Sequence, residues 1–141
     1  MLTNSSESAA VNVVLDSWAV LRYIEDDGPA AQHVADLLDS QRPVMSWLDL
    51  GEVFYIVRRI HGDRVAVDTT RDLRRVIDCR LPDETAVVAA ARIKADHPIA
   101  YADAFAAATA LSHDATLWTG DPELLLTGAP WRWRDLRGDP L

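Results

Sequence analysis

Four acidic side chains stand in contexts where an acid is chemically unusual. Asp16 ends the apolar run VNVVLD, and Asp121 follows the apolar run ATLW by three positions. Glu52 in SWLDLGEVFYIV and Asp103 in AYADAFAAATA have mostly apolar neighbours on both sides. An unpartnered carboxylate in such surroundings is costly to keep ionised, but a shared divalent cation holds the acids deprotonated and is held by them. The contexts of these acids therefore predict a metal site built from carboxylates.

Each of these acids also has a purely structural interpretation. Asp16 and Asp121 could each be the N-cap of a following helix. Asp103 could be a first-turn acid favoured by the helix dipole, and Glu52 could be an exposed acid opposite an arginine of its own helix. With 22 acidic residues in the chain, finding four at some spacing carries no weight by itself. The prediction depends on the contexts.

The elements that position these acids alternate between strands and helices. We predict strands at residues 11–16, 43–45, 79–81, 115–118 and 130–134, and helices at 17–24, 29–40, 46–62, 85–96 and 101–112. A further helix opens at Asp63 or Asp68, and a short one is expected to begin at Pro122. Alternating strands and helices predict an α/β sandwich on a short parallel sheet, and ligands bind beyond the carboxyl ends of such strands. The last strand, which carries Trp131 and Trp133 on one face, is expected at a sheet edge.

The charge of the chain limits how it can meet nucleic acid. A formal net charge of −8 argues against binding by charge alone, because phosphate contacts normally depend on Lys and Arg. A divalent cation held by the acids would supply positive charge locally. Seven of the fourteen basic residues lie between Arg58 and Arg80. They form either a solvated helical face or a rim that steers phosphate or a partner.

Length and cysteine content indicate a small globular domain without disulfide bonds. A chain of 141 residues can bury a core without disulfides, and the single cysteine, Cys79, has no partner within the chain. This pattern suits the cytoplasm, where we expect the protein. Residues 1–10 lack the features of a secretory signal, and no apolar run is long enough to span a membrane. We predict a disordered N-terminus over residues 1–10 and a single domain over residues 11–141.

The motifs that hold the four acids resemble those of PIN-domain nucleases. VVLDSWAVL is similar to the family's opening strand motif and SWLDLGEVFY to its second acid-bearing helix. YADAFAAATA followed by ATLWTGDPEL is similar to its closing pair of motifs. The resemblance spans residues 11–126 in the expected order, and the size is similar to that of VapC toxins of VapBC toxin–antitoxin pairs. Trp18, where a smaller residue is usual, and ten additional N-terminal residues depart from the family pattern.

This resemblance implies a PIN-like three-layer sandwich and a metal-dependent ribonuclease. Asp16, Glu52, Asp103 and Asp121 match the family's acidic quartet, and Thr119 matches the hydroxyl residue beside the last acid. Oxygen ligands select Mg²⁺ or Mn²⁺, one or two of which would activate a water for attack on an RNA phosphodiester. We expect Asp16 and Asp103 to be the most direct ligands, Glu52 to act through water or as a base, and Asp121 to complete the shell. Thr119 would donate to phosphate or orient Asp121.

The resemblance also implies partners. A small antitoxin would inhibit the enzyme, with an apolar groove lined by Trp18, Leu21, Tyr23 or Trp47 as its seat. A homodimer is likewise expected, and no contact with a membrane.

Two alternatives remain. A non-catalytic PIN-like binding module is disfavoured by the presence of all four acids. A phosphatase using Asp16 as nucleophile would need a second acid where Trp18 stands and Lys94 as its partner base. Separated histidines and the lone cysteine argue against zinc, no phosphate-binding glycine loop occurs, and no motif supplies a base for Ser17 as nucleophile.

Overall fold

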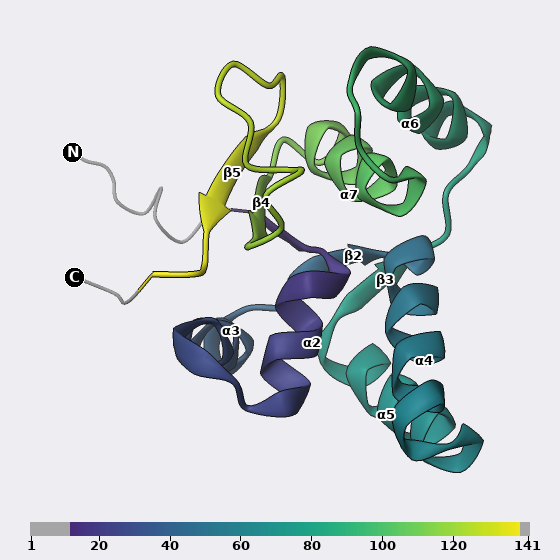
Figure 1. Ribbon diagram of the computed structural model, residues 1–141, viewed down its shortest axis with the longest axis vertical. Coiled ribbons are helices and arrows are strands. Elements are labelled where there is room, and N and C mark those ends of the chain that lie inside the picture. The colour runs from purple at the N-terminus through teal and green to yellow at the C-terminus, as the bar shows by residue number, and fades with distance from the viewer. Residues whose placement is uncertain (1–11, 139–141) are drawn as a thin grey trace.

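Five short parallel strands form one sheet in the computed structural model, which describes residues 12–138 (Figure 1). They are β1 (Val13–Leu15), β2 (Val44–Ser46), β3 (Asp78–Arg80), β4 (Thr116–Thr119) and β5 (Arg132–Asp135). Their order across the sheet is β3-β2-β1-β4-β5, and every adjacent pair is parallel. The short parallel sheet is confirmed, and β5 lies at an edge as expected. The central strand is β1.

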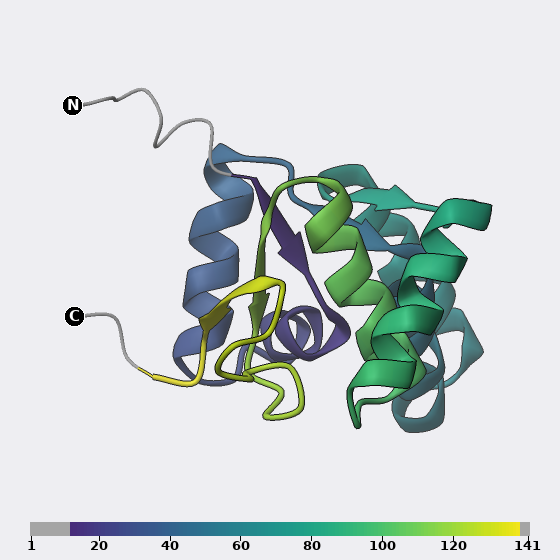
Figure 2. The ribbon, with the colours of Figure 1, turned by 90° about the horizontal axis from the view of Figure 1, so that it is seen from above.

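Six helices in the described part of the chain connect these strands. They are α2 (Ser17–Glu25), α3 (Gly28–Ser40), α4 (Trp47–His61), α5 (Asp63–Val76), α6 (Glu84–Asp96) and α7 (Tyr101–Ser112). Figure 1 shows α6 and α7 on one side of the sheet and α2 to α5 on the other, and Figure 2 shows α6 and α7 from above. The chain therefore forms the predicted sandwich of helices, sheet and helices. None of these helices combines the length and apolarity needed to cross a membrane.

The central strand divides the interior into two hydrophobic cores. Val13 and Leu15 of β1 pack with α2 to α5, whereas Val14 packs with α6 and α7 on the opposite face. Successive side chains of a strand point to opposite faces, so a three-residue strand is enough to serve both cores. All three side chains are buried, as expected for a parallel sheet covered on both faces.

Local signals set most of the helix boundaries. The Ser46 hydroxyl accepts a hydrogen bond from the Leu48 N–H at 3.2 Å and caps α4, and Gly62, with φ of 93°, ends the helix. Asp63, rather than Asp68, opens α5. The helix predicted over residues 46–62 thus agrees with α4 and its two caps. The predicted disordered segment, residues 1–10, lies outside the described residues.

The short helix expected at Pro122 was a wrong prediction. The Asp121 carboxylate accepts a hydrogen bond from the Glu123 N–H at 2.9 Å, and the chain makes only a turn there. Carbonyl oxygens of Leu124 and Leu126 then accept the indole N–H groups of the tryptophans at 131 and 133, at 3.0 and 3.1 Å. These bonds tie the segment to β5, so it does not continue as a helix. β5 accordingly begins at residue 132 rather than 130.

The two-core arrangement predicts a large difference between two leucines. Leu117 of β4 is fully buried in the core beneath α7, whereas Leu81 is 77% exposed. Leu117→Ala is expected to lower the free energy of unfolding by about 2–5 kcal/mol, because it leaves a cavity. Leu81→Ala is expected to change it by less than about 0.5 kcal/mol. Urea denaturation measures both, and equal losses would contradict the buried position of Leu117.

Candidate active site

The carboxyl ends of the strands deliver a set of acids to one edge of the sheet. Asp16 follows β1 directly, and Asp121 follows β4 by two residues. Asp49 lies in the first turn of α4, which starts immediately after β2, and Asp103 lies in the first turn of α7. Parallel strands place all their carboxyl ends at the same edge of the sheet, and the helices that return along the sheet begin at that edge. The fold therefore collects acids from four separate segments.

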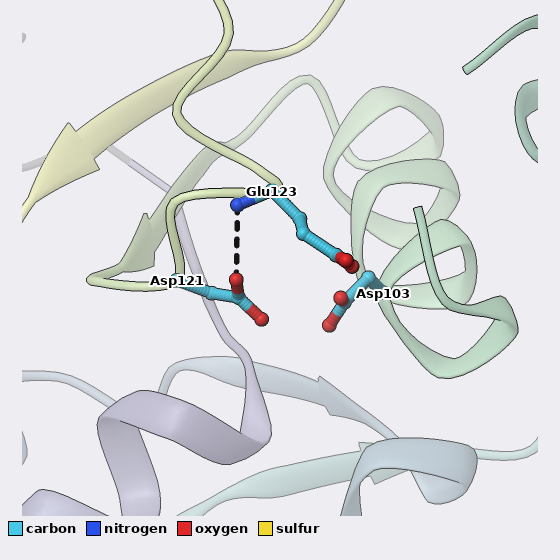
Figure 3. Close-up of side chains that lie close together, drawn as sticks. All are labelled: Asp103, Asp121 and Glu123. Atoms are coloured by element: carbon cyan, nitrogen blue, oxygen red, sulfur yellow. Dashed lines mark hydrogen bonds between the residues drawn. The ribbon is translucent and has the colours of Figure 1, made fainter. Parts of the chain in front are cut away.

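An acid-lined pocket opens at this edge, with a volume of ≈ 340 Å³. Four carboxylates line it, namely those of Glu52, Asp103, Asp121 and Glu123. Figure 3 shows three of them, Asp103 from α7 and Asp121 and Glu123 from the loop after β4, facing one another. One carboxylate oxygen of each lies within 4.8 Å of the others. The pocket thus has several oxygen donors within the reach of one small cation.

Asp16 is buried and fixed by two hydrogen bonds. Its Oδ1 accepts from the Ala19 N–H at 2.9 Å, which makes it the N-cap of α2, and its Oδ2 accepts from the Thr119 hydroxyl. The Thr119 oxygen in turn accepts from the Asp121 N–H at 2.9 Å. Asp16 therefore has the structural role of a cap and a position beside the pocket acids at the same time. Thr119 orients the Asp121 main chain rather than its carboxylate.

Glu52 is half-buried and points toward the start of α2. Its Oε1 accepts a hydrogen bond from the Ser17 hydroxyl, and its Oε2 accepts from the Tyr55 hydroxyl at 3.5 Å. Arg58, the arginine one and a half turns further along the helix, bonds instead to Asp63 at 3.0 Å. Glu52 is therefore not the arginine-paired surface acid of the structural alternative.

Two acids of this edge were missed by the sequence analysis. Asp49 is fully buried one turn before Glu52, and neither of its oxygens accepts a side-chain hydrogen bond within the described residues. Glu123 joins the pocket two residues after Asp121, and its Oε1 accepts from the Ala100 N–H at 3.1 Å. The spacing of Asp49 and Glu52 on one helix face was a usable signal, because residues three apart are neighbours there. For Glu123 the only signal in the sequence was its position two residues after Asp121.

The environment makes these carboxyl groups hard to ionise. Burial raises the pKa of Asp16 to about 7, although the hydrogen bonds from Thr119 and Ala19 lower it, and the charges of Asp121 and Glu52 raise it further. Burial, followed by the neighbouring Asp121, Glu123 and Asp16, raises the pKa of Asp103 to about 8. Burial, and then the charges of Asp16, Glu52 and Asp103, raises the pKa of Asp49 well above its usual value, although a hydrogen bond from the Ser17 main chain lowers it.

Little positive charge compensates these acids. Among residues 12–138, none of the six forms a salt bridge; they are Asp16, Asp49, Glu52, Asp103, Asp121 and Glu123. Arg22 lines the pocket, but its guanidinium lies over the Trp18 ring and pairs with Glu25 and Asp27 at 3.7 and 3.4 Å. A set of crowded, unpaired carboxylates with oxygen donors only fits a hard divalent cation such as Mg²⁺ or Mn²⁺.

Trp18 forms one wall of the pocket and packs against Gly120. A Cβ added to Gly120 would lie 2.3 Å from the nearest ring carbon of Trp18, far inside van der Waals contact. The larger residue at position 18 is therefore matched by the absence of a side chain at position 120. This contact brings the start of α2 against the loop that carries Asp121.

The apolar residues expected to form one groove are distributed over different surfaces. Trp18 and Leu21 line the acid pocket, whereas Tyr23 lines a separate pocket between α2 and α5. The Arg74 guanidinium covers the Trp47 ring at 4.9 Å from its centroid. A continuous groove through all four is thus not present in the described part of the chain.

Comparisons with known proteins give a family and a fold. The family model described as PIN domain matches residues 13–129. VapBC-1 of nontypeable Haemophilus influenzae has a TM-score of 0.69 at 20% identity, over 89% of this chain and 98% of its own. DNA-bound VapBC of Salmonella typhimurium has a TM-score of 0.71 at 15% identity, over 89% and 98%. VapC20 of Mycobacterium tuberculosis, described as a sarcin–ricin loop cleaving toxin, has a TM-score of 0.68 at 18% identity, over 83% and 95%. Among curated proteins no sequence match was found. Because the identities are low, these structural similarities establish a shared fold and nothing more specific.

The raised pKa values predict how the stability of the metal-free protein depends on pH. Asp16 and Asp103 release protons in the unfolded chain near pH 4, but in the folded chain only near pH 7 and 8. Between these limits the folded state binds more protons, so its stability falls as pH rises. In EDTA, the free energy of unfolding is expected to fall by a few kcal/mol between pH 5 and pH 8.5. Denaturation at both pH values measures this, and Asp103→Asn should flatten the dependence; rising stability over this range would contradict the assigned burial.

The contact between Gly120 and Trp18 predicts a coupled pair of substitutions. Gly120→Ala is expected to cost about 1–3 kcal/mol of stability, because the new methyl group displaces the Trp18 ring. In a Trp18→Leu background the same change should cost much less. Gly51→Ala is the control, since nothing lies within 4 Å of its added Cβ and alanine favours the helix. A double-mutant cycle with no coupling energy would show that the two residues do not touch.

Proposed function

The chain belongs to the PIN domain family, and from this premise we propose that it is a metal-dependent endoribonuclease, the toxin of a toxin–antitoxin pair. The observation that supports this most directly is the acid-lined pocket at the carboxyl ends of β1 and β4. Glu52, Asp103 and Asp121 line it, and buried Asp16 is linked to it through Thr119. A pocket of uncompensated carboxylates repels a phosphodiester unless a cation is bound, so metal and substrate are expected together.

The carboxylates of Asp103 and Asp121, with those of Asp16 and Glu52, are the groups that would hold Mg²⁺ or Mn²⁺. When bound, such an ion lowers the pKa of water and neutralises charge that develops on phosphate oxygens. Glu123 is added to the expected ligands, because its carboxylate lies within 4.8 Å of those of Asp103 and Asp121.

The chain's own residues hold this arrangement in place before substrate arrives. Thr119 keeps one Asp16 oxygen turned toward the end of β4, and the Ala19 N–H fixes the other. The Ser17 hydroxyl donates a hydrogen bond to Glu52 and holds it at the pocket. We assign Glu52 the role of accepting the proton of the attacking water. Trp18 closes one side and restricts how the RNA backbone can approach. Catalytic geometry held by hydrogen bonds and packing needs little reorganisation during reaction.

RNA is the substrate class we propose, and a small antitoxin is the proposed protein partner. VapC20, which shares the fold, is described as cleaving the sarcin–ricin loop, and two other matched structures are VapBC complexes. Structured RNA of the ribosome is therefore the first substrate to test. A homodimer and a cytoplasmic location belong to the same proposal.

The arginine-rich stretch contributes less to RNA binding than its charge suggests. Within it, four arginines pair with nearby acids at 2.9 to 3.6 Å: Arg58, Arg71, Arg75 and Arg80. These are exposed ion pairs on and beside α5, which favours a solvated helical face over a phosphate-steering rim.

The phosphatase alternative loses support from the position of its nucleophile. Asp16 is 1% exposed, and both of its oxygens already accept hydrogen bonds from Ala19 and Thr119. A covalent nucleophile must be exposed to the phosphorus atom that it attacks, and Asp16 is almost completely enclosed. The non-catalytic alternative is tested by metal binding and turnover together.

Substitution of single pocket acids tests the nuclease. Asp103→Asn and Asp121→Asn are each expected to lower the rate of RNA cleavage by about 100-fold or more, because ligands that hold the metal act on the transition state. Asp39→Asn, an exposed acid on α3, is the matched control and should retain full activity. The measurement is cleavage of a sarcin–ricin loop oligonucleotide and of transfer RNA in Mn²⁺ or Mg²⁺, with EDTA as blank. Cleavage that persists in both pocket variants would overturn the proposed site.

A further inference from the structure

We propose that Asp49 is an additional ligand of the divalent cation, so that α4 supplies two carboxylates to the metal centre, Asp49 and Glu52. This inference rests on the metal dependence in the proposed function. It concerns a residue that is fully buried and not among those that line the pocket, and that the four-acid pattern in the sequence does not include.

The first support is that the Asp49 carboxylate is buried without a side-chain partner. Asp49 is 0% exposed, both Oδ1 and Oδ2 are enclosed, and no side chain within residues 12–138 donates a hydrogen bond to either oxygen. The Ser17 main chain lowers the pKa of this carboxyl, but burial and three like charges outweigh it. Buried carboxylates are nearly always hydrogen-bonded, paired or bound to a metal, because desolvation of an isolated charge costs several kcal/mol. A second acid of this edge, Asp16, is equally buried but has both oxygens bonded. Among residues 12–138, Asp49 is therefore the only acid whose two carboxylate oxygens are both fully enclosed and accept no side-chain hydrogen bond.

The second support is the electrostatic environment of Asp49. The charges that raise its pKa belong to Asp16, the N-cap residue of α2, to Glu52 of α4 and to Asp103 of α7. Asp49 thus lies among the acids of the site and not against an unrelated part of the core. Three like charges around an unpartnered carboxylate destabilise the metal-free protein, and a divalent cation bound among them turns that repulsion into attraction.

The third support is the way the backbone places Asp49. Ser46 ends β2 and caps α4, so Asp49 falls in the first turn of the helix, directly at the sheet edge. Leu50 and Val53 beside it are buried in the core below, which fixes the rotation of the helix. Glu52, one turn along the same face, reaches the pocket itself. Two acids three positions apart on a rigid helix form a preorganised pair of oxygen donors.

A purely structural role for Asp49 predicts different behaviour from a ligand role. A structural carboxylate would accept hydrogen bonds that stabilise the fold, and its loss would lower stability with or without metal. A ligand without other partners destabilises the metal-free protein, so its replacement raises stability in EDTA while it weakens metal binding. The two readouts move in opposite directions only if Asp49 is a ligand.

The test compares wild type, Asp49→Asn and the exposed control Asp39→Asn. Mn²⁺ binding is measured by calorimetry, and the Tm is measured at pH 8 in EDTA and in saturating Mn²⁺. For Asp49→Asn we expect a Tm above that of wild type in EDTA, a smaller rise on addition of Mn²⁺, and an Mn²⁺ affinity weaker by about tenfold or more. Asp49→Ser, smaller and also uncharged, repeats the measurement if the asparagine variant fails to fold.

The outcomes separate this inference from the proposed function. Unchanged Mn²⁺ affinity in the folded Asp49 variants, with wild type binding normally, would overturn the ligand role and leave the nuclease intact. Lower stability of both variants in EDTA would equally overturn it, because the carboxylate would then support the fold. A wild-type protein that binds no Mn²⁺ would instead contradict the metal dependence of the proposed function and this inference with it.

Discussion

At the carboxyl ends of β1 and β4, mutual repulsion among carboxylates, of which Asp16, Asp49 and Asp103 are buried, is the constraint around which the rest of the molecule is arranged. Six acids meet there, and among the described residues none of them has a salt-bridge partner. Repulsion and desolvation both oppose folding, so the remainder of the chain must supply enough stability to hold the acids together. It does so with two hydrophobic cores that share one buried strand, β1.

The packing of α7 shows how this helix, and Asp103 on it, comes close to the sheet. Five buried alanines lie along this helix, and they keep its axis near the sheet because they add little bulk: Ala104, Ala106, Ala107, Ala108 and Ala110. As a result Asp103, in the first turn, reaches the acids that follow β4. On the other side, the hydrogen bonds through Thr119 connect the ends of β1 and β4 directly. The small side chains of α7 and the Thr119 hydroxyl in the sheet thus both bring the acids of the site close together.

Much of this arrangement follows from local rules that the sequence displays, and the remainder depends on contacts between distant segments. The buried strand before Asp16, the cap at Ser46 and the stop at Gly62 each have a local signal, and the structure has all three. Asp49 has the same residue type as many surface acids, and only tertiary packing makes it buried and unpartnered. The turn after Asp121 was not predicted for a related reason. The indole N–H groups of Trp131 and Trp133 donate hydrogen bonds to main-chain carbonyls of that segment, which is a contact that local sequence does not show. The fit of Trp18 against Gly120 likewise joins residues that lie far apart in the chain.

The acidity of the pocket has a consequence for substrate binding under the proposed function. A chain with a formal net charge of −8, in which four of the seven arginines between residues 58 and 80 form exposed ion pairs, has little long-range attraction for RNA. Binding energy must then come from the neighbourhood of the acids themselves, and only once a cation has reversed the sign of the local field. Metal occupancy and RNA affinity are in that case thermodynamically coupled, so each strengthens the other by the same factor. The same carboxylates that oppose folding when empty therefore make the site selective for a cation and its phosphate ligand.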